Sequence, residues 1–210
     1  IFIWNIVMHD SVKKYQNIIS AITSELEAEK TIKIPKIIAV SKTFNLEKII
    51  PLIEFGHLDY GENKVQEAID KWSEIKTKKQ DIKLHLIGKL QTNKVKLALK
   101  IFDYIHSLDN KKLAKKISDE QLKQNKKIKL FIQVNIGNED QKSGVNTSEL
   151  NELYNYCKQL NLNIIGLMCI PPVNKDPEKY FKETNFLRKE LSLPELSMGM
   201  SSDYLKAVQN

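Results

Sequence analysis

The strongest constraint on this fold is a repeated alternation of short apolar runs with amphipathic stripes of helical spacing. The first run, residues 37–40, is rich in β-branched side chains, and Leu46, Ile49 and Ile53 follow it at helical intervals. The same pair of signals recurs to residues 196–200, after a first helix that starts near Asp10. Strands joined by crossover helices pair in parallel. The pattern therefore predicts an α/β fold.

A doubly wound sheet could also take seven strands, but the turn after the first strand favours a barrel. We expect strands at residues 37–40, 58–60, 84–87, 104–106, 130–134, 164–168 and 196–200, the first of them buried on both faces. A doubly wound sheet usually has a Gly-rich turn after its first strand, but here Ser41-Lys42-Thr43 follows. The better prediction is a (β/α)8 TIM-type barrel that lacks its eighth strand because the chain ends early. No linker-like break occurs, so residues 8–210 are expected to form one domain.

The helix starts and the first residues carry further expectations. Side-chain caps are predicted at Asp10, Asn45, Asn110, Asn146 (in a capping box with Glu149) and Asp176. The apolar opening is interrupted by Asn5 and has no basic segment before it, so it does not fit a signal peptide. We expect residues 1–7 to be an upstream extension. No run approaches the length of a transmembrane helix.

The cysteines and the charge narrow the class of protein. Cys157 and Cys169 form no metal-type pair and are expected to be buried free thiols in a reducing cytoplasm. The net charge of +7 raises the question of nucleic acid, yet Arg188 is the only arginine among 33 basic residues. Dedicated base readers favour arginine, so solvated helix faces are the preferred interpretation. A basic nucleic-acid module stays an alternative, and its binding would fall steeply with salt.

One lysine stands apart by its position. The active site of such a barrel lies at the carboxyl ends of the strands, and Lys42 directly follows the first apolar run. A lysine partly shielded from water at a barrel mouth can attack an aldehyde. The alternative is that Lys42 simply extends to solvent. Position alone leaves both interpretations open.

Eight short motifs then follow one another along the chain. They are IAVSKT at 38–43, GENKVQEA at 61–68, HLIG at 85–88 with LQTNK at 90–94, HSLD at 106–109, QVN at 133–135, KSG at 142–144, GLM at 166–168 and SMGMSSD at 197–203. Together they resemble the motifs of the pyridoxal phosphate homeostasis proteins, the YggS/PROSC-type family. The order is that of the family, and the matches span most of the chain.

The resemblance implies a barrel related to the N-terminal domain of alanine racemase that binds pyridoxal 5′-phosphate (PLP). Lys42 would hold the cofactor as an internal aldimine, and Ser201 would help to cradle its phosphate. The remaining candidates to line the cofactor are Asn63, Ser107, Asn135, Met168 and Met200. Asn63 and Ser107 could instead cap helices, and Met168 could be core. His85 is expected to be a satisfied core histidine, and no metal ligand is expected.

The function that the resemblance implies is PLP homeostasis or carriage without turnover. PLP-dependent apoenzymes are the candidate partners, and a monomer or weak dimer is expected. The alternative is a racemase- or decarboxylase-like enzyme, which needs a proton-transfer group opposite the cofactor. Tyr60 and Cys169 are the candidates that we place near the barrel mouth. The family continues into an eighth strand with an arginine, so we expect a truncated chain that binds the cofactor weakly.

Overall fold

The computed structural model describes residues 9–28, 34–139 and 143–210. Seven parallel strands form one sheet in the order β1 to β7. The strands are β1 (Ala39–Val40), β2 (Asp59–Glu62), β3 (Lys83–Leu86), β4 (Tyr104–Leu108), β5 (Lys129–Val134), β6 (Ile164–Cys169) and β7 (Glu195–Ser197). The helices are α1 (Asp10–Ala28), α2 (Leu46–Glu54), α3 (Val65–Lys78), α4 (Val95–Ile101), α5 (Lys111–Gln124), α6 (Leu150–Gln159), α7 (Pro177–Glu190) and α8 (Tyr204–Val208). Short 3-10 turns, Thr92–Lys94 and Thr147–Glu149, precede α4 and α6.

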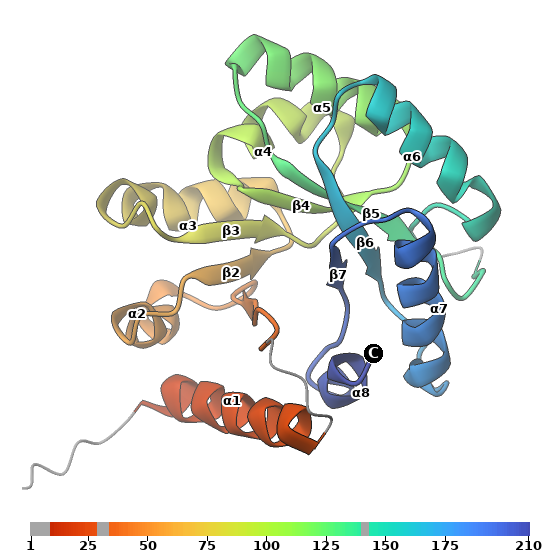
Figure 1. The fold of residues 1–210 in the computed structure, drawn as a ribbon. Helices are drawn as coiled ribbons and strands as arrows, with labels where there is room; N and C mark the ends of the chain where they lie inside the picture. Colours follow the sequence, from red (N-terminus) through yellow and green to blue (C-terminus); the bar gives the residue numbers. More distant parts are fainter. Residues whose placement is uncertain (1–8, 29–33, 140–142) are drawn as a thin grey trace, which may run out of the picture.

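The sheet curves into a barrel that stays open on one side. The crossover helices α2 to α7 lie around its outer face, and α1 and α8 lie next to each other on the open side (Figure 1). Within the described residues β1 pairs only with β2, and β7 only with β6. The prediction of a TIM-type barrel short of one strand is confirmed.

The main hydrophobic core lies between the sheet and the outer helices. Its largest fully buried side chains include Trp72, Phe102 and Phe181. Burying a side chain of this size stabilises the fold by roughly 1.5–3 kcal/mol. Phe131 is also buried, but it stacks on His106 and not in this core. Because successive strand residues face opposite sides, the inner face of the sheet carries a second, more polar layer.

Both edge strands differ from prediction. The first strand is not buried on both faces: it is two residues long, and Val40 is 45% exposed. An edge strand has a neighbour on one side only, which leaves its side chains open to solvent. The last strand ends at Ser197 and not at residue 200, because Gly199 adopts a φ of +86° that breaks the extended run.

Helix caps follow the predictions in part. Asn110 and Asp176 cap α5 and α7 with side-chain hydrogen bonds, as predicted. The other predicted caps are wrong: α1 begins at Asp10 itself, and Asn45 and Asn146 form no side-chain cap. Asn146 bonds the side chain of Glu149 and not a backbone amide, so no capping box forms. Short polar side chains at a helix start have several competing partners, and sequence spacing does not choose between them.

Other expectations concern the ends and the thiols. The predicted extension, residues 1–7, lies outside the described residues. Within the described part of the chain no helix is long and apolar enough to cross a membrane. Cys157 and Cys169 are both buried and free, as predicted.

Candidate functional site

Lys42 occupies a tight turn at the carboxyl end of β1. The turn is closed by the amide of Phe44, which donates to the Ser41 carbonyl at 3.2 Å. Thr43 has a φ of +67°, a conformation that costs a non-glycine residue on the order of 1 kcal/mol. The Lys42 side chain is exposed, so of the two interpretations left open by the sequence the structure favours extension to solvent. Its place at the strand end is what distinguishes it from the other lysines.

A buried cluster behind this turn fixes the residue before Lys42. Glu62, fully buried at the end of β2, accepts from the Ser41 hydroxyl at 2.7 Å, the Lys71 ammonium at 2.9 Å and the Trp72 indole at 2.9 Å. Lys71 also donates to the Ser41 carbonyl at 2.8 Å. We call Ser41, Glu62, Lys71 and Trp72 the Glu62 cluster. Because these bonds hold both the hydroxyl and the carbonyl of Ser41, the cluster anchors the start of the turn that carries Lys42.

The Glu62 cluster was missed by sequence reasoning. Its acidic member lies inside the GEN motif, and its lysine and tryptophan follow on the next helix. A buried carboxylate must be paired, so a glutamate that ends an apolar strand was the available signal. The pairing partners could only be identified once α3 was placed on the sheet.

Asn63 follows β2 at the same rim as Lys42. A Cβ on Gly88 would lie 2.3 Å from the Asn63 carbonyl oxygen, so only glycine permits this close approach of the two strand ends. The Asn63 side chain is half-buried and forms no hydrogen bond within the described residues. It does not cap α3, whose capping residue is Lys64. The amide is therefore available to a ligand.

Ser107 has a buried hydroxyl with no hydrogen-bond partner in the described part of the chain. An unpaired buried polar group costs about 1–3 kcal/mol, so such a group fits a ligand that would complete it. Asn110 and not Ser107 caps the following helix. Asn135 differs, because its amide group already bonds both backbone groups of Glu139 at 3.0 and 3.2 Å. Asn135 thus holds the loop after β5.

Met168 lies buried within β6, beside Ser197 in the β6–β7 register. It is outside the hydrophobic cluster between sheet and helices, so it does not belong to the main core. With Gln133 on its other side, Met168 faces the interior of the barrel.

The loop from Ser197 to Asp203 follows the last described strand. The Asp203 carboxylate accepts from the Met200 amide at 2.5 Å, and the Met200 carbonyl accepts from the Tyr204 amide at 2.9 Å. The Met200 and Ser201 side chains are exposed. Within the described residues the amides of Ser201 and Ser202 have no hydrogen-bond acceptor. Free amides and hydroxyls at one turn are suited to bind an anion such as phosphate.

Neither candidate proton-transfer group faces the barrel interior: the placement of Tyr60 near the mouth is wrong, whereas Cys169 ends β6 at the expected rim but has a buried side chain. Tyr60 is fully buried between His57 and Trp72, and its hydroxyl donates to the His57 carbonyl at 3.2 Å. Burial raises the pKa of Tyr60 well above its ordinary value. Cys169 is buried against Thr184 of α7, and burial raises the pKa of its thiol to about 11. Both side chains face the helix layer.

His85 lies on the inner face, and both of its ring nitrogens have hydrogen-bond partners. The prediction of a satisfied buried histidine is confirmed. No group of three side chains suited to hold a metal ion occurs among the residues that the structure describes.

The fold and the rim residues first define a class. Residues 19–210 match the family described as alanine racemase, N-terminal domain. The chain is therefore a barrel of the alanine racemase type, with a lysine after its first strand and a serine-rich loop after β7.

Comparison with individual proteins defines the family. The chain is 41% identical over 184 residues to the pyridoxal phosphate homeostasis protein of Aquifex aeolicus, covering 83% of this chain and 80% of that protein. The structure of PipY from Synechococcus elongatus with PLP bound is 34% identical, with a TM-score of 0.77 over 90% of this chain and 93% of that one. The crystal structure of an unknown protein from Bifidobacterium adolescentis has a TM-score of 0.86 at 25% identity, covering 97% of this chain and 93% of that one. This chain belongs to the pyridoxal phosphate homeostasis protein family.

Proposed function

We propose that this protein binds PLP covalently through Lys42 and serves in its intracellular homeostasis or carriage, without catalytic turnover. The observation that carries the proposal is a set of polar groups at one end of the parallel sheet that have no partner among the described residues. They are the Lys42 amine, the Asn63 amide, the buried Ser107 hydroxyl and the free donors of Ser201. Membership of the family and the PLP-bound relative support the same assignment.

The chemistry of PLP matches these groups one by one. The cofactor supplies an aldehyde that can bond to an amine and a phosphate that carries negative charge. Lys42 provides the amine, on a turn that the Glu62 cluster anchors through Ser41. Ser201 provides an amide and a hydroxyl for the phosphate. We assign four further residues to contacts with the cofactor: Asn63, Ser107, Met168 and Met200. Asn135 supports the site indirectly, because its side chain holds the loop after β5.

The non-catalytic role is supported by the position of the candidate acid–base groups. Tyr60 and Cys169 lie in the helix layer, on the far side of the sheet from the proposed cofactor position. Both side chains are buried and pack away from the barrel interior, which supports a role without turnover. A cytoplasmic location remains part of the proposal, and PLP-dependent apoenzymes remain the proposed recipients.

A spectroscopic titration tests the proposal. Wild-type protein titrated with PLP should gain the visible absorption of a cofactor bonded to a protein amine, and Lys42→Ala should not. Lys48→Ala, which removes an exposed lysine of α2, is the matched control and should behave as wild type. Equal absorption from Lys42→Ala would refute the assignment.

The alternative functions give different results in two further assays. Racemisation or decarboxylation of amino acids that depends on Lys42 would overturn the carrier role and favour an enzyme. Duplex DNA binding that weakens steeply between low and moderate salt, in the absence of PLP binding, would favour a nucleic-acid module.

A further inference from the structure

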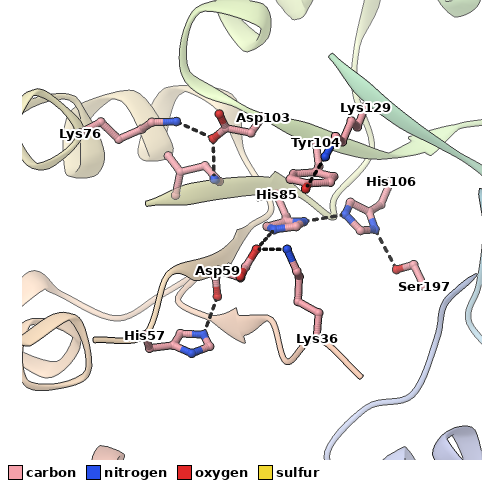
Figure 2. Close-up of polar contacts among 11 residues, drawn as sticks. Lys36, His57, Asp59, Lys76, His85, Asp103, Tyr104, His106, Lys129 and Ser197 are labelled. Carbon is pink, nitrogen blue, oxygen red and sulfur yellow. Dashed lines mark hydrogen bonds and ion pairs between the residues drawn. The ribbon is translucent and has the colours of Figure 1, made fainter. Parts of the chain in front are cut away.

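A chain of hydrogen bonds crosses the interior of the barrel from β2 to β7 (Figure 2). The Asp59 carboxylate lies 2.9 Å from Nε2 of His85, and Nδ1 of His85 lies 2.9 Å from Nε2 of His106. Nδ1 of His106 then lies 2.7 Å from the Ser197 hydroxyl. We call Asp59, His85, His106 and Ser197 the interior chain. It starts at the amino end of β2 and ends at the carboxyl end of β7.

The carboxylate at one end fixes the direction of every hydrogen bond in the interior chain. Burial alone would raise the pKa of Asp59, but the His85 hydrogen bond and the Lys36 charge outweigh it and lower that pKa. Burial lowers the pKa of both histidines, so both rings are neutral at neutral pH. Asp59 can only accept, so His85 donates to it and accepts from His106. His106 in turn must accept at Nδ1, which makes the Ser197 hydroxyl a donor.

Aromatic rings hold the two imidazoles in place. Tyr104 stacks on His85 with ring centroids 4.2 Å apart, and Phe131 stacks on His106 at 4.3 Å. His106 is 1% exposed, so water cannot replace Ser197 as its partner without entering the barrel interior. The position of His106 Nδ1 is therefore set by the body of the barrel.

Ser197 is the residue at which this rigid interior meets the candidate phosphate loop. It is the last residue of β7, a three-residue strand that pairs only with β6 among the described residues. Gly199 and Ser201 follow in the loop, and the strand's own pairing ends at Ser197. The hydrogen bond to His106 thus ties the start of the loop to β4.

We propose that His106 is a positioning residue: through Ser197 it fixes the loop that carries Ser201, and so gives the site its preference for phosphorylated over unphosphorylated pyridoxal. This inference rests on the proposed function. It predicts that the substitution weakens only the binding of the phosphate group, because the turn that carries Lys42 is anchored separately, by the bonds of the Glu62 cluster to Ser41.

The test compares PLP with pyridoxal, which has the aldehyde but no phosphate. Ser197→Ala removes one hydroxyl and leaves little empty space, so it is the primary variant. It should weaken PLP binding about tenfold, the effect of losing one well-placed hydrogen bond in a binding site, while pyridoxal affinity stays within about twofold. Ser118→Ala removes a buried serine hydroxyl of α5 that bonds the Leu160 carbonyl, and should change neither affinity.

Substitution of His106 provides a second measurement. His106→Gln keeps an acceptor for Ser197 and a donor for His85, so it should retain most of the preference for PLP. His106→Phe keeps a planar ring to pack on Phe131 but loses both hydrogen bonds, so it should lose the preference. The melting temperature of each cofactor-free variant shows whether the barrel is intact.

The outcomes separate this inference from the proposed function. Wild type that binds neither ligand refutes the proposed function and this inference with it. Wild type that binds PLP, with a Ser197→Ala variant that loses PLP and pyridoxal affinity equally, shows a merely structural role and overturns this inference alone. An unchanged PLP affinity in Ser197→Ala overturns it as well.

Discussion

Mild acid should destabilise this protein in part through His106, and His106→Gln should remove that part of the sensitivity. Burial, with a smaller contribution from His85, lowers the pKa of His106 from 6.5 to about 3. Between these values the unfolded chain binds a proton on this side chain and the folded chain does not. Stability therefore falls as the pH falls below 6.5 and is fully present above it.

The size of the effect follows from the two pKa values. Each pH unit below 6.5 costs the folded state about 1.4 kcal/mol for one proton, so the share of His106 at pH 4.5 is on the order of 3 kcal/mol. The free energy of unfolding of the wild type should fall with pH more steeply than His106 alone explains, because burial also lowers the pKa of His85. The titratable and charged groups that lie around His106, directly or through His85, are Asp59, Lys36, Tyr104 and Lys129.

Urea unfolding at pH 6.5, 5.5 and 4.5 measures this slope. The free energy of unfolding of His106→Gln should fall less steeply than that of wild type, by about 1.4 kcal/mol per pH unit. His9→Gln, which removes an exposed histidine, should keep the wild-type slope. Equal slopes for wild type and His106→Gln would show that the buried histidine is not held neutral, and the direction assigned to the interior chain would fail.

Three substitutions at the rim should each give a distinct result. Glu62→Ala leaves the half-buried Lys71 ammonium without its carboxylate and the Ser41 hydroxyl and Trp72 indole without their acceptor, and should lower the free energy of unfolding by about 3–5 kcal/mol in urea titrations. Ser107→Ala should leave the cofactor-free protein as stable or up to about 1 kcal/mol more stable, since it removes an unpaired buried hydroxyl, yet weaken PLP binding in a spectroscopic titration. Gly88→Ala should cost about 1–3 kcal/mol in thermal unfolding, because its Cβ would displace the Asn63 backbone, and should also weaken PLP binding.

A control substitution and two contrary outcomes test these predictions. Glu67→Gln breaks an exposed ion pair with Lys64 and should change the free energy of unfolding by less than about 1 kcal/mol. A Glu62→Ala protein of wild-type stability would mean that the cluster does not hold the Lys42 turn. If Ser107→Ala bound PLP normally, Ser107 would not be a cofactor contact.

The strands and helices could largely be predicted, because their apolar periodicity is local. The errors fall at the edges: residue 198 and beyond lie outside β7, since a positive φ at Gly199 interrupts an otherwise strand-like sequence. The apolar run around Val40 is typical of a core strand, yet Val40 is half-exposed. Its burial depends on a second neighbouring strand, and among the described residues β1 pairs only with β2.

Sequence position could identify a candidate site residue only where the residue's immediate neighbours in the chain distinguish it. Lys42 could be singled out because it directly follows an apolar run. The Glu62 cluster and the interior chain could not, since Glu62 meets Trp72 across the sheet–helix interface and His106 meets Ser197 across 91 residues of sequence. Such contacts depend on tertiary placement, which apolar periodicity does not encode. The same limit explains why Tyr60, close to a strand end in sequence, was wrongly placed at the barrel mouth.

The central claim is that Lys42, among the many lysines of this chain, carries the cofactor. The most direct measurement is borohydride reduction of the protein incubated with stoichiometric PLP, followed by digestion and mass spectrometry of the labelled peptides. The account predicts one dominant label, on the peptide that contains Lys42, and its loss in Lys42→Ala. A label spread evenly over exposed lysines, or concentrated on another lysine, would contradict it.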